Sequence, residues 1–310
     1  MRAMILGAGL GVRMRPLSNL VAKPALPILG LPVVVILLEF LRHHGVSEVL
    51  INTHHLGDSI REAVDRFAPP DLDVSWSEEA RLLGTGGGIR RAAKFLEESE
   101  TSLVLAGDML LDLDLSAAIQ RHRDRGCRAS LLLKRDVRSA RFGTIGIDRA
   151  GVVRRVGQRT DLGGEVDAGL FLSARILSRR AFDDLPAREV FEDLSDWFVP
   201  RLQAGHRDIE GQLLDTAECT WEPVGTPEEY LRTNIQPPEL SYLASSAILR
   251  RSGAQAIGDV VVGSGSRVPA TAQLERCVIW ENETVPENLE GIDGVFACGT
   301  FYPALPHSKK

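Results

Sequence analysis

The chain has 310 residues, of which 44% are hydrophobic and 25% charged, and its formal net charge is −6. This size and composition fit one large globular domain, or one domain with an appendage. The acidic balance excludes a broad basic surface for nucleic acid but is compatible with a local basic pocket. The four cysteines are widely spaced without a C-x-x-C pair, so we expect reduced thiols. The chain opens on a strand-like segment rather than a leader peptide, and its apolar runs are too short to span a membrane, so we expect a cytoplasmic protein.

The first 140 residues alternate short apolar runs with amphipathic stretches. Strands are predicted at residues 4–6, 48–51, 74–76, 103–106 and 129–134, and helices at 32–44, 58–67, 89–96 and 115–125. Such an alternation with short connections predicts an α/β fold, with a Rossmann-like, mostly parallel sheet and helices on both faces.

The pattern changes after about residue 140. Strands are predicted at 144–147, 152–156 and 168–172, helices at 176–182 and 190–202, and a helix capped by Thr226 beginning at Pro227. The pair Pro237-Pro238 marks a boundary, which divides the chain into domains 1–236 and 237–310. In the second domain aliphatic residues recur about every six positions, which favours a left-handed parallel β-helix-like appendage over an irregular one.

The segment after the first predicted strand combines alternate glycines with cations: Gly7, Gly9, Gly11, Arg13, Arg15 and Lys23. The dinucleotide fingerprint would place its third glycine at Val12, and the P-loop would end in Gly-Lys-Ser/Thr, so neither motif fits. Glycine amides that approach phosphate oxygens, together with fixed cations, are suited to a polyanion. The alternative is a tight turn without a ligand.

Two further stretches follow predicted strands. The glycine run at residues 83–88 enters a helix, where a flat base could lie against the backbone; the alternative is a flexible turn. Asp108 stands at the carboxyl end of the apolar strand 103–106, the edge where ligands bind in open α/β sheets. A single carboxylate opposite a phosphate loop predicts a Mg²⁺ ligand, since Mg²⁺ is shared between carboxylates and substrate phosphates.

The second half offers weaker candidates. Arg155 or Arg159 could meet a second phosphate, although a solvated strand face is equally compatible. Asp167 and Gly169 could hold sugar hydroxyls. The segment 221–226 forms a turn with an aromatic residue and a Gly-Thr pair.

Taken together, four motifs in order resemble the sugar-1-phosphate nucleotidyltransferases, also called NDP-sugar pyrophosphorylases. They are the opening loop with Arg13 and Lys23, the glycine run at 83–87, Ala106-Gly107-Asp108, and the segment 221–230. The resemblance covers residues 1 to about 234 and extends to two branches, guanylyltransferases acting on mannose-1-phosphate and uridylyltransferases acting on N-acetylmuramate-1-phosphate.

The resemblance implies an enzyme that uses Mg²⁺, an NTP and a sugar-1-phosphate, whose oxygen attacks the α-phosphorus in line and releases pyrophosphate. Arg13 would hold the β,γ-phosphates, Lys23 the α-phosphate region, and Asp108 the metal. Nucleotide-binding residues would be Leu6, Gly7, Ala8, Gly9, Gly11, Leu83, Gly84, Thr85, Gly86 and Gly107, and sugar-phosphate-binding residues Arg159, Asp167, Gly169 and Gly225. GTP with a mannose- or heptose-type sugar is slightly favoured over UTP. Neither nucleic acid nor a membrane is an expected partner, and the C-terminal domain could mediate a homo-oligomer.

Two departures from the family pattern bear on activity. The sugar-phosphate segment Glu-Lys-Pro is replaced by residues 158–160, Gln-Arg-Thr, and Pro223 stands where a second metal carboxylate is expected. Glu222 could replace it only through a bulge, because neighbouring strand residues face opposite sides; Asp167 and Glu165 are other candidates. The alternative function is therefore a weak or inactive homologue that binds a nucleotide sugar as a regulatory or assembly subunit.

Overall fold

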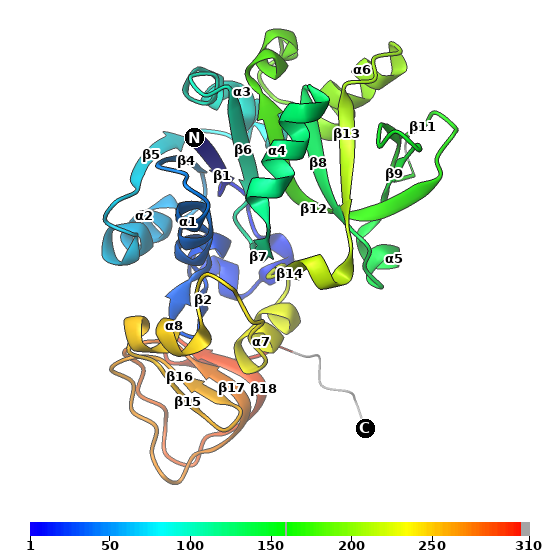
Figure 1. Cartoon of the computed structure of the whole chain (residues 1–310). Helices are drawn as coiled ribbons and strands as arrows, with labels where there is room; N and C mark the ends of the chain where they lie inside the picture. Colours follow the sequence, from blue (N-terminus) through cyan, green and yellow to red (C-terminus); the bar gives the residue numbers. More distant parts are fainter. Residues whose placement is uncertain (159, 305–310) are drawn as a thin grey trace.

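The computed structural model describes residues 1–158 and 160–304, and a mixed sheet forms the body of the molecule (Figure 1). Its parallel part runs in the order β6 (Thr101–Ala106), β1 (Arg2–Leu6), β4 (Glu48–Thr53) and β5 (Asp73–Glu78). On the other side of β6, the long strand β12 (Asp167–Ser178) pairs antiparallel with β6. From β12 one branch continues through β8 (Ala129–Lys134) to β13 (Ile209–Leu214). A second branch continues through β9 (Ile145–Ile147) and β10 (Val153–Val156) to β11 (Thr160–Asp161).

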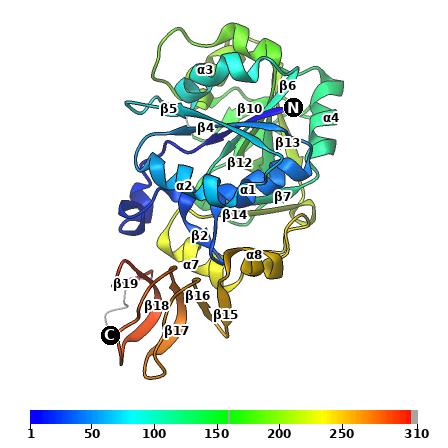
Figure 2. The ribbon, with the colours of Figure 1, turned by 90° about the vertical axis from the view of Figure 1, so that its left-hand side faces the viewer.

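Helices cover both faces of this sheet, as Figure 2 shows with α3 on one side and α1 and α2 on the other. One face carries α1 (Val33–His43), α2 (Gly57–Phe67) and α4 (Leu115–Arg125), and the other α3 (Gly84–Leu96) and α6 (Val199–Gln203). Alternate residues of β1 enter the two cores: Ile5 packs with α1 and α2, and Met4 packs with α3. The predicted α/β class is therefore confirmed.

Several short elements lie in segments without a clear hydrophobic period. They are the 3₁₀ turns Val12–Met14, Leu17–Asn19, Lys23–Ala25, Arg179–Asp184 and Thr216–Glu218, the ribbon β2 (Pro27–Ile28) and β3 (Leu31–Pro32), and α5 (Ser139–Phe142). A separate two-stranded sheet pairs β7 (Met109–Leu113) with β14 (Cys219–Pro223) in antiparallel register, with Pro223 opposite Met109. This pairing brings the segment after Pro223 beside Asp108.

The prediction of a helix at 176–182 is wrong. Strand β12 continues to Ser178, and only a 3₁₀ turn follows it. Ile176 and Leu177 enter opposite cores, so the run is apolar because both faces of the strand are buried. A short apolar run of this kind has no period that separates a buried strand from a helix. The helix predicted at 190–202 begins only at Asp193, and its first part is a π turn (Leu194–Phe198) that continues directly into α6.

After α7 (Pro227–Ile235) and α8 (Ser245–Ser252) the chain forms a second sheet of β15 (Gln255–Ile257), β16 (Val260–Val262), β17 (Gln273–Ile279), β18 (Glu290–Ala297) and β19 (Thr300–Pro303). The three central strands are parallel, and Val260, Cys277 and Gly294 stack at equal spacing along the chain. The sheet packs under α7, where Trp280 Nε1 donates to the hydroxyl of buried Tyr230 at 3.0 Å.

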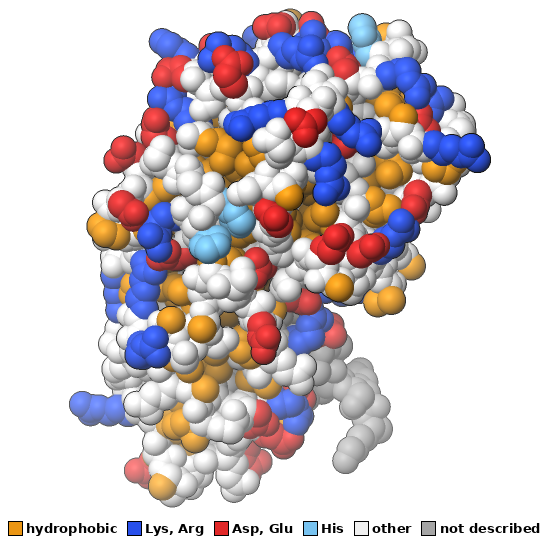
Figure 3. All heavy atoms as spheres, in the orientation of Figure 1, with side chains coloured by type: hydrophobic (Ala, Val, Ile, Leu, Met, Phe, Trp, Pro, Cys, Tyr) orange, Lys and Arg blue, Asp and Glu red, His pale blue; other side chains and the backbone are white. Residues whose placement is uncertain are grey.

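Lys and Arg side chains are interspersed with Asp and Glu on the face that Figure 3 shows. All four cysteines are free, and Cys298 is the exposed one. Among the described residues, the helices fall short of the length and hydropathy that a membrane span needs.

Candidate active site

Two adjoining cavities open at the carboxyl edge of β1, β4 and β6. The smaller one, about 470 Å³ and here called the loop cavity, is lined by the opening loop and the start of α3. The larger one, about 880 Å³ and here called the large cavity, extends towards Phe142, Trp221 and Pro223. The residues common to both linings, here called the shared wall, are Thr85, Ala106, Asp108, Ser173, Arg175 and Glu192. Two ligands bound in these cavities would therefore meet at this wall.

A buried polar link holds the opening loop in place. The Gly7 N–H donates to Asn52 Oδ1 at 2.9 Å, and Asn52 Nδ2 donates to Glu79 Oε1 at 2.7 Å. The other oxygen of Glu79 accepts from the Leu83 N–H at 3.0 Å. A Cβ on Gly7 would lie 2.8 Å from the Asn52 carbonyl oxygen, so this approach requires glycine. The two glycine loops are thus joined through an amide and a carboxylate.

Lys23, Asp108 and Gly225 come together at the boundary of the cavities. The Lys23 side chain is only 9% exposed, and its Nζ donates to Asp108 Oδ2 at 3.2 Å and to the Gly225 carbonyl at 3.1 Å. The Asp108 carbonyl accepts from the Val224 N–H at 2.8 Å, which fixes the strand ends together. Arg13 lines the large cavity, and a Cβ on Gly225 would lie 3.6 Å from its Nη2. Three sequence-distant motifs therefore supply one cluster.

Behind this cluster lies a buried carboxylate. Glu229, in the first turn of α7, is 1% exposed and accepts from the Gly225 N–H at 2.9 Å. Its second oxygen pairs with Arg141 at 3.0 Å. The Thr226 hydroxyl accepts from the Glu229 N–H at 3.3 Å, which confirms the predicted cap of α7. The start of α7 is thus held by polar contacts on both sides of Gly225.

The glycine run at the start of α3 accommodates another chain segment. Gly84 has a φ of +75°, and a Cβ there would collide with the Phe191 carbonyl. A Cβ on Gly86 would meet the Phe191 ring. The Gly87 N–H also donates to the Phe191 carbonyl at 3.1 Å. The immediate role of this run is therefore to admit residues 189–193, where the sequence predicted close approach of a base.

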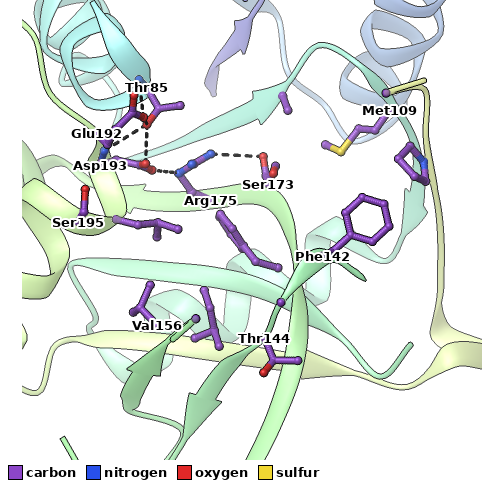
Figure 4. A pocket seen from close by; sticks show the side chains of 18 of the residues that line it. Thr85, Met109, Phe142, Thr144, Val156, Ser173, Arg175, Glu192, Asp193 and Ser195 are labelled. Atoms are coloured by element: carbon purple, nitrogen blue, oxygen red, sulfur yellow. Dashed lines mark hydrogen bonds and ion pairs between the residues drawn. The ribbon is translucent and has the colours of Figure 1, made fainter. Parts of the chain in front are cut away.

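Acidic side chains from that segment reach the first turn of α3, as Figure 4 shows. The Thr85 N–H donates to Glu192 Oε2 at 3.2 Å, and its hydroxyl lies 2.7 Å from the same oxygen. The hydroxyl is also 2.6 Å from Asp193 Oδ1. Asp193 in turn forms a buried ion pair with Arg175. A chain of contacts thus joins the helix start to a cation in the shared wall.

The region that contains both cavities is similar in sequence to a known protein family. The family model described as nucleotidyl transferase matches residues 2–237, which include both cavity linings. The protein belongs to this family. The predicted resemblance is confirmed, and the protein is an enzyme of the nucleotidyltransferase type.

Named relatives fall in more than one branch. The UTP--glucose-1-phosphate uridylyltransferase of Synechocystis is 29% identical over 295 residues, covering 86% of this chain and 75% of that protein. The mannose-1-phosphate guanylyltransferase of Mycobacterium tuberculosis is 28% identical, with coverage of 91% and 80%. Among solved structures, HddC from Yersinia pseudotuberculosis complexed with GMP-PN has a TM-score of 0.63 and 25% identity, covering 75% of this chain and 97% of that one.

The predicted nucleotide-binding residues of this nucleotidyltransferase divide into two groups. Those that line the loop cavity are Leu6, Gly7, Ala8, Gly9, Gly84 and Thr85. Gly11, Leu83, Gly86 and Gly107 lie outside both linings and shape the backbone instead. Gly107, for example, packs so closely on the Leu6 carbonyl that a Cβ would lie 2.9 Å from its oxygen.

The predicted sugar-phosphate residues are less well gathered. Gly225 lines the large cavity, whereas Arg159 lies outside the described residues. Asp167 accepts two hydrogen bonds from Arg135 at 2.7 and 2.8 Å, and this guanidinium lowers the pKa of the Asp167 carboxyl. A Cβ on Gly169 would press on Leu133 and Leu213, so this glycine serves strand packing. Asp167 and Gly169 are therefore placed apart from both cavity linings.

The candidate replacements for a second metal carboxylate are also committed elsewhere. Pro223 lines the large cavity, and Glu222 points to the other side of β14, as strand alternation requires. Glu222 Oε2 accepts from Arg138 at 3.2 Å and from Arg232 at 3.1 Å. Glu165 pairs with Arg155 at 2.6 Å. Of the two carboxylates in the shared wall, Asp108 and Glu192, Asp108 is the one that pairs with Lys23.

This donor set fits a metal held jointly by protein and substrate. Groups of three or more His, Cys, Asp or Glu suited to a metal are absent from residues 1–158 and 160–304, so this part of the chain provides no cage of its own. Asp108 is about one-third exposed, at 35% for its side chain, and one of its oxygens is not engaged by Lys23. Mg²⁺ commonly combines one or two carboxylates with phosphate oxygens and water. A Mg²⁺ that enters with an NTP is compatible with this geometry.

An aromatic floor closes the large cavity. Phe142 meets Trp221 edge to face at 5.2 Å, and Arg138 lies over the Trp221 ring at 5.0 Å. Asp136 holds Arg138 with two hydrogen bonds of 2.8 and 2.9 Å. The Arg138 guanidinium lowers the pKa of Asp136 to about 2. The floor is thus fixed by an ion pair that the sequence analysis did not identify.

Proposed function

We propose that this nucleotidyltransferase joins an NTP to a sugar-1-phosphate, forming an NDP-sugar and pyrophosphate. An oxygen of the sugar phosphate attacks the α-phosphorus, and the bond from that phosphorus to the bridging oxygen of the β-phosphate breaks. Pyrophosphate leaves with the electron pair. The observation that supports this proposal is Asp108 in the shared wall, paired with Lys23 of the loop cavity, between two cavities of suitable size for two substrates.

The protein contributes position and charge to this transfer. Lys23 is anchored by Asp108 and by the Gly225 carbonyl, so its ammonium is held in place before any substrate binds. Lys23 neutralises the α-phosphate region, and Arg13 holds the departing β,γ-phosphates. Reactions of this kind need little covalent help from the protein, because charge neutralisation and alignment lower the barrier. Asp108 would hold a Mg²⁺ ion, which supplies further neutralisation of the phosphate charge when bound.

The acidic lining of the loop cavity favours GTP. Glu79 and Glu192 both line it; the two oxygens of Glu79 already accept from Asn52 and Leu83, so Glu192 is the carboxylate open to a ligand. Guanine carries two neighbouring donors, N1–H and the 2-amino group, that match a carboxylate, whereas uracil offers a single N–H. The complex of HddC with GMP-PN and the named mannose-1-phosphate guanylyltransferase support the same choice. UTP is the second candidate, because another relative is named a uridylyltransferase.

The large cavity favours a mannose- or heptose-type sugar. Its lining includes Phe142, Phe171 and Trp221, whose rings present apolar surface to the C–H face of a pyranose. Its volume of about 880 Å³ leaves room for a sugar larger than a hexose.

We also propose that the C-terminal sheet is a left-handed β-helix-like unit that mediates assembly of subunits. The equal spacing of its parallel strands supports the β-helix. Val261, Val278 and Trp280 belong to the main core, so this strip packs on the catalytic domain. Contact between subunits has to use other residues, of which Ile257 and Ile292 are exposed by 61% and 51%. Light scattering of the wild type and of an Ile257→Lys variant tests this assembly.

The test of the proposed activity is pyrophosphate release. The protein is incubated with Mg²⁺, each NTP in turn and a panel of sugar-1-phosphates, with Asp108→Ala as the control. We expect GTP with a mannose- or heptose-1-phosphate to give the highest rate. If every pair gives only the rate of Asp108→Ala, while an NDP-sugar still binds in calorimetry, the alternative function as a regulatory or assembly subunit replaces the enzyme.

A further inference from the structure

Arg175 is a buried cation that the sequence analysis did not single out. It lies in β12 and is 3% exposed, yet it lines both cavities. The pairing of β12 with β8 shifts register between Phe171 and Arg175, and Ser173 has a φ of +55°. This irregularity re-aims the strand, as bulges next to functional sites do. The Arg175 guanidinium then stacks over the Phe171 ring at 4.9 Å.

The guanidinium is held firmly on one side. Its Nε forms an ion pair with Asp193, and its Nη1 donates to the Ser173 carbonyl at 3.3 Å. Asp193 is itself fixed, because its N–H donates to Thr85 Oγ1 at 3.1 Å and its Oδ1 lies 2.6 Å from the same hydroxyl. Figure 4 shows this chain of contacts running from Thr85 through Asp193 to Arg175. Such anchoring fixes the direction of the remaining donors.

The second terminal nitrogen, Nη2, has no hydrogen-bond acceptor among the residues that the structure describes. A guanidinium carries five N–H donors in a rigid fork, and the two contacts above engage only part of it. Among the described residues, the fully buried side-chain atoms without a partner do not include Nη2, so this donor is accessible from the cavities, where a ligand or water can accept from it. The free side of Arg175 therefore has the character of a binding site for an anion.

The charges of the shared wall point to the same conclusion. Asp108 and Glu192 are acidic, and Arg175 is the cation of this wall. In the proposed reaction two anionic groups, the α-phosphate of the NTP and the phosphate of the sugar, have to approach each other here. Lys23 serves the nucleotide side and contacts Asp108. Arg175, as a second cation next to Lys23's side of the site, offsets the repulsion between the phosphates.

We propose that Arg175 binds the phosphate of the sugar-1-phosphate and aligns it for attack, with Asp193 as its positioning residue. The planar fork of arginine matches two phosphate oxygens, which lysine cannot do. This role rests on the proposed function for the reaction step, but binding of a phosphate monoester at Arg175 does not require turnover. The competing interpretation is a purely structural ion pair that fastens residues 191–198 to β12.

The experiment compares Arg175→Gln, Arg175→Lys and Asp193→Asn with the wild type. The matched control is Arg201→Gln, because Arg201 also has a largely buried side chain and pairs with Asp208 at 2.7 Å, away from both cavities. The kinetic readout is kcat and KM for each substrate separately. The binding readout is the thermal shift produced by mannose-1-phosphate and by inorganic phosphate, each without NTP.

We expect Arg175→Gln to lose about 10- to 100-fold in kcat/KM for the sugar phosphate, the range for one charge-assisted contact, while the KM for NTP changes far less. Arg175→Lys should recover part of this loss, and Asp193→Asn should raise the same KM more weakly. Arg201→Gln should lower the thermal midpoint and leave both KM values unchanged. Both phosphate ligands should stabilise the wild type but not Arg175→Gln.

The inference is overturned if Arg175→Gln lowers stability as Arg201→Gln does and leaves the KM for the sugar phosphate unchanged. If Arg175→Gln does not fold, Arg175→Lys decides, because wild-type kinetics in that variant exclude a bidentate phosphate contact. Absence of turnover with every substrate pair defeats the proposed function but not this inference, which the thermal shifts then decide. Wild-type protein that neither phosphate ligand stabilises defeats the inference itself.

Discussion

The loop cavity and the large cavity are formed by largely different parts of the chain. Around the loop cavity, the predicted residues come from strand ends and backbone amides, and most of them meet. Around the large cavity, three residues considered for the sugar phosphate or the metal, Asp167, Gly169 and Glu222, contact other partners instead. Arg175 and the aromatic floor line this cavity. Where a site is made by backbone at parallel strand ends, each contributing motif is local in sequence and can be recognised there. A site made by side chains across a sheet depends on register, which a single sequence does not reveal.

The largest expected effect concerns Lys23. Replacing it with Met removes the ammonium that joins Asp108 to the Gly225 carbonyl, so we expect kcat to fall on the order of 1000-fold. The matched control is Lys134→Met, because Lys134 is equally buried but pairs with Asp136 at 3.6 Å outside both cavities. Steady-state pyrophosphate release measures both. Similar losses in the two variants would show that the effect comes from folding rather than from the site.

The next effect concerns the link between the glycine loops. Asn52→Leu keeps the volume but leaves the Gly7 N–H and the buried Glu79 carboxylate without their partner. We expect a loss of about 2–3 kcal/mol in unfolding free energy, together with a higher KM for NTP. Denaturant unfolding and steady-state kinetics measure the two parts. Loss of stability with an unchanged KM for NTP would show that the link supports the sheet and not the nucleotide.

A smaller effect concerns the floor of the large cavity. The pKa of Asp136 is lowered to about 2 in the folded state by Arg138, so its contribution to stability is complete above its unfolded pKa of 3.8. It is lost as the pH falls from about 4 through 2. We expect Asp136→Asn to cost about 1–2 kcal/mol at pH 7, with the difference from wild type shrinking over that acid range. Urea unfolding at several pH values measures it, and a constant difference would contradict the assignment.

The smallest effect concerns the missing carboxylate. Pro223 lines the large cavity beside Asp108, so Pro223→Asp should lower the Mg²⁺ concentration for half-maximal activity by about 3- to 10-fold. Glu222→Gln is the control, since Glu222 faces Arg138 and Arg232 and should not change this midpoint. A Mg²⁺ midpoint that does not move in Pro223→Asp would show that the metal does not approach position 223.

Much of the fold could be predicted where local signals agree. The bounds of α4 were predicted without error, because Asp114 caps it through the Ala117 N–H at 2.9 Å and Gly126 ends it with a positive φ of 57°. The segment at 176–182 was misread because burial on both faces removes the strand period. Asn52 and Glu79 were missed for another reason: a buried polar pair has meaning only once distant strands are paired.

The contact between Tyr230 and Trp280 has a consequence for how the protein can be divided. Glu229 and Tyr230 are neighbours in α7, yet the first braces Gly225 in the active site and the second is held by the C-terminal sheet. One turn of α7 therefore contacts both the candidate site and the C-terminal sheet. A chain cut after residue 236 would expose the Tyr230 side of α7 and release the brace on Gly225. We therefore expect the catalytic domain to need its C-terminal sheet even where that sheet touches no substrate.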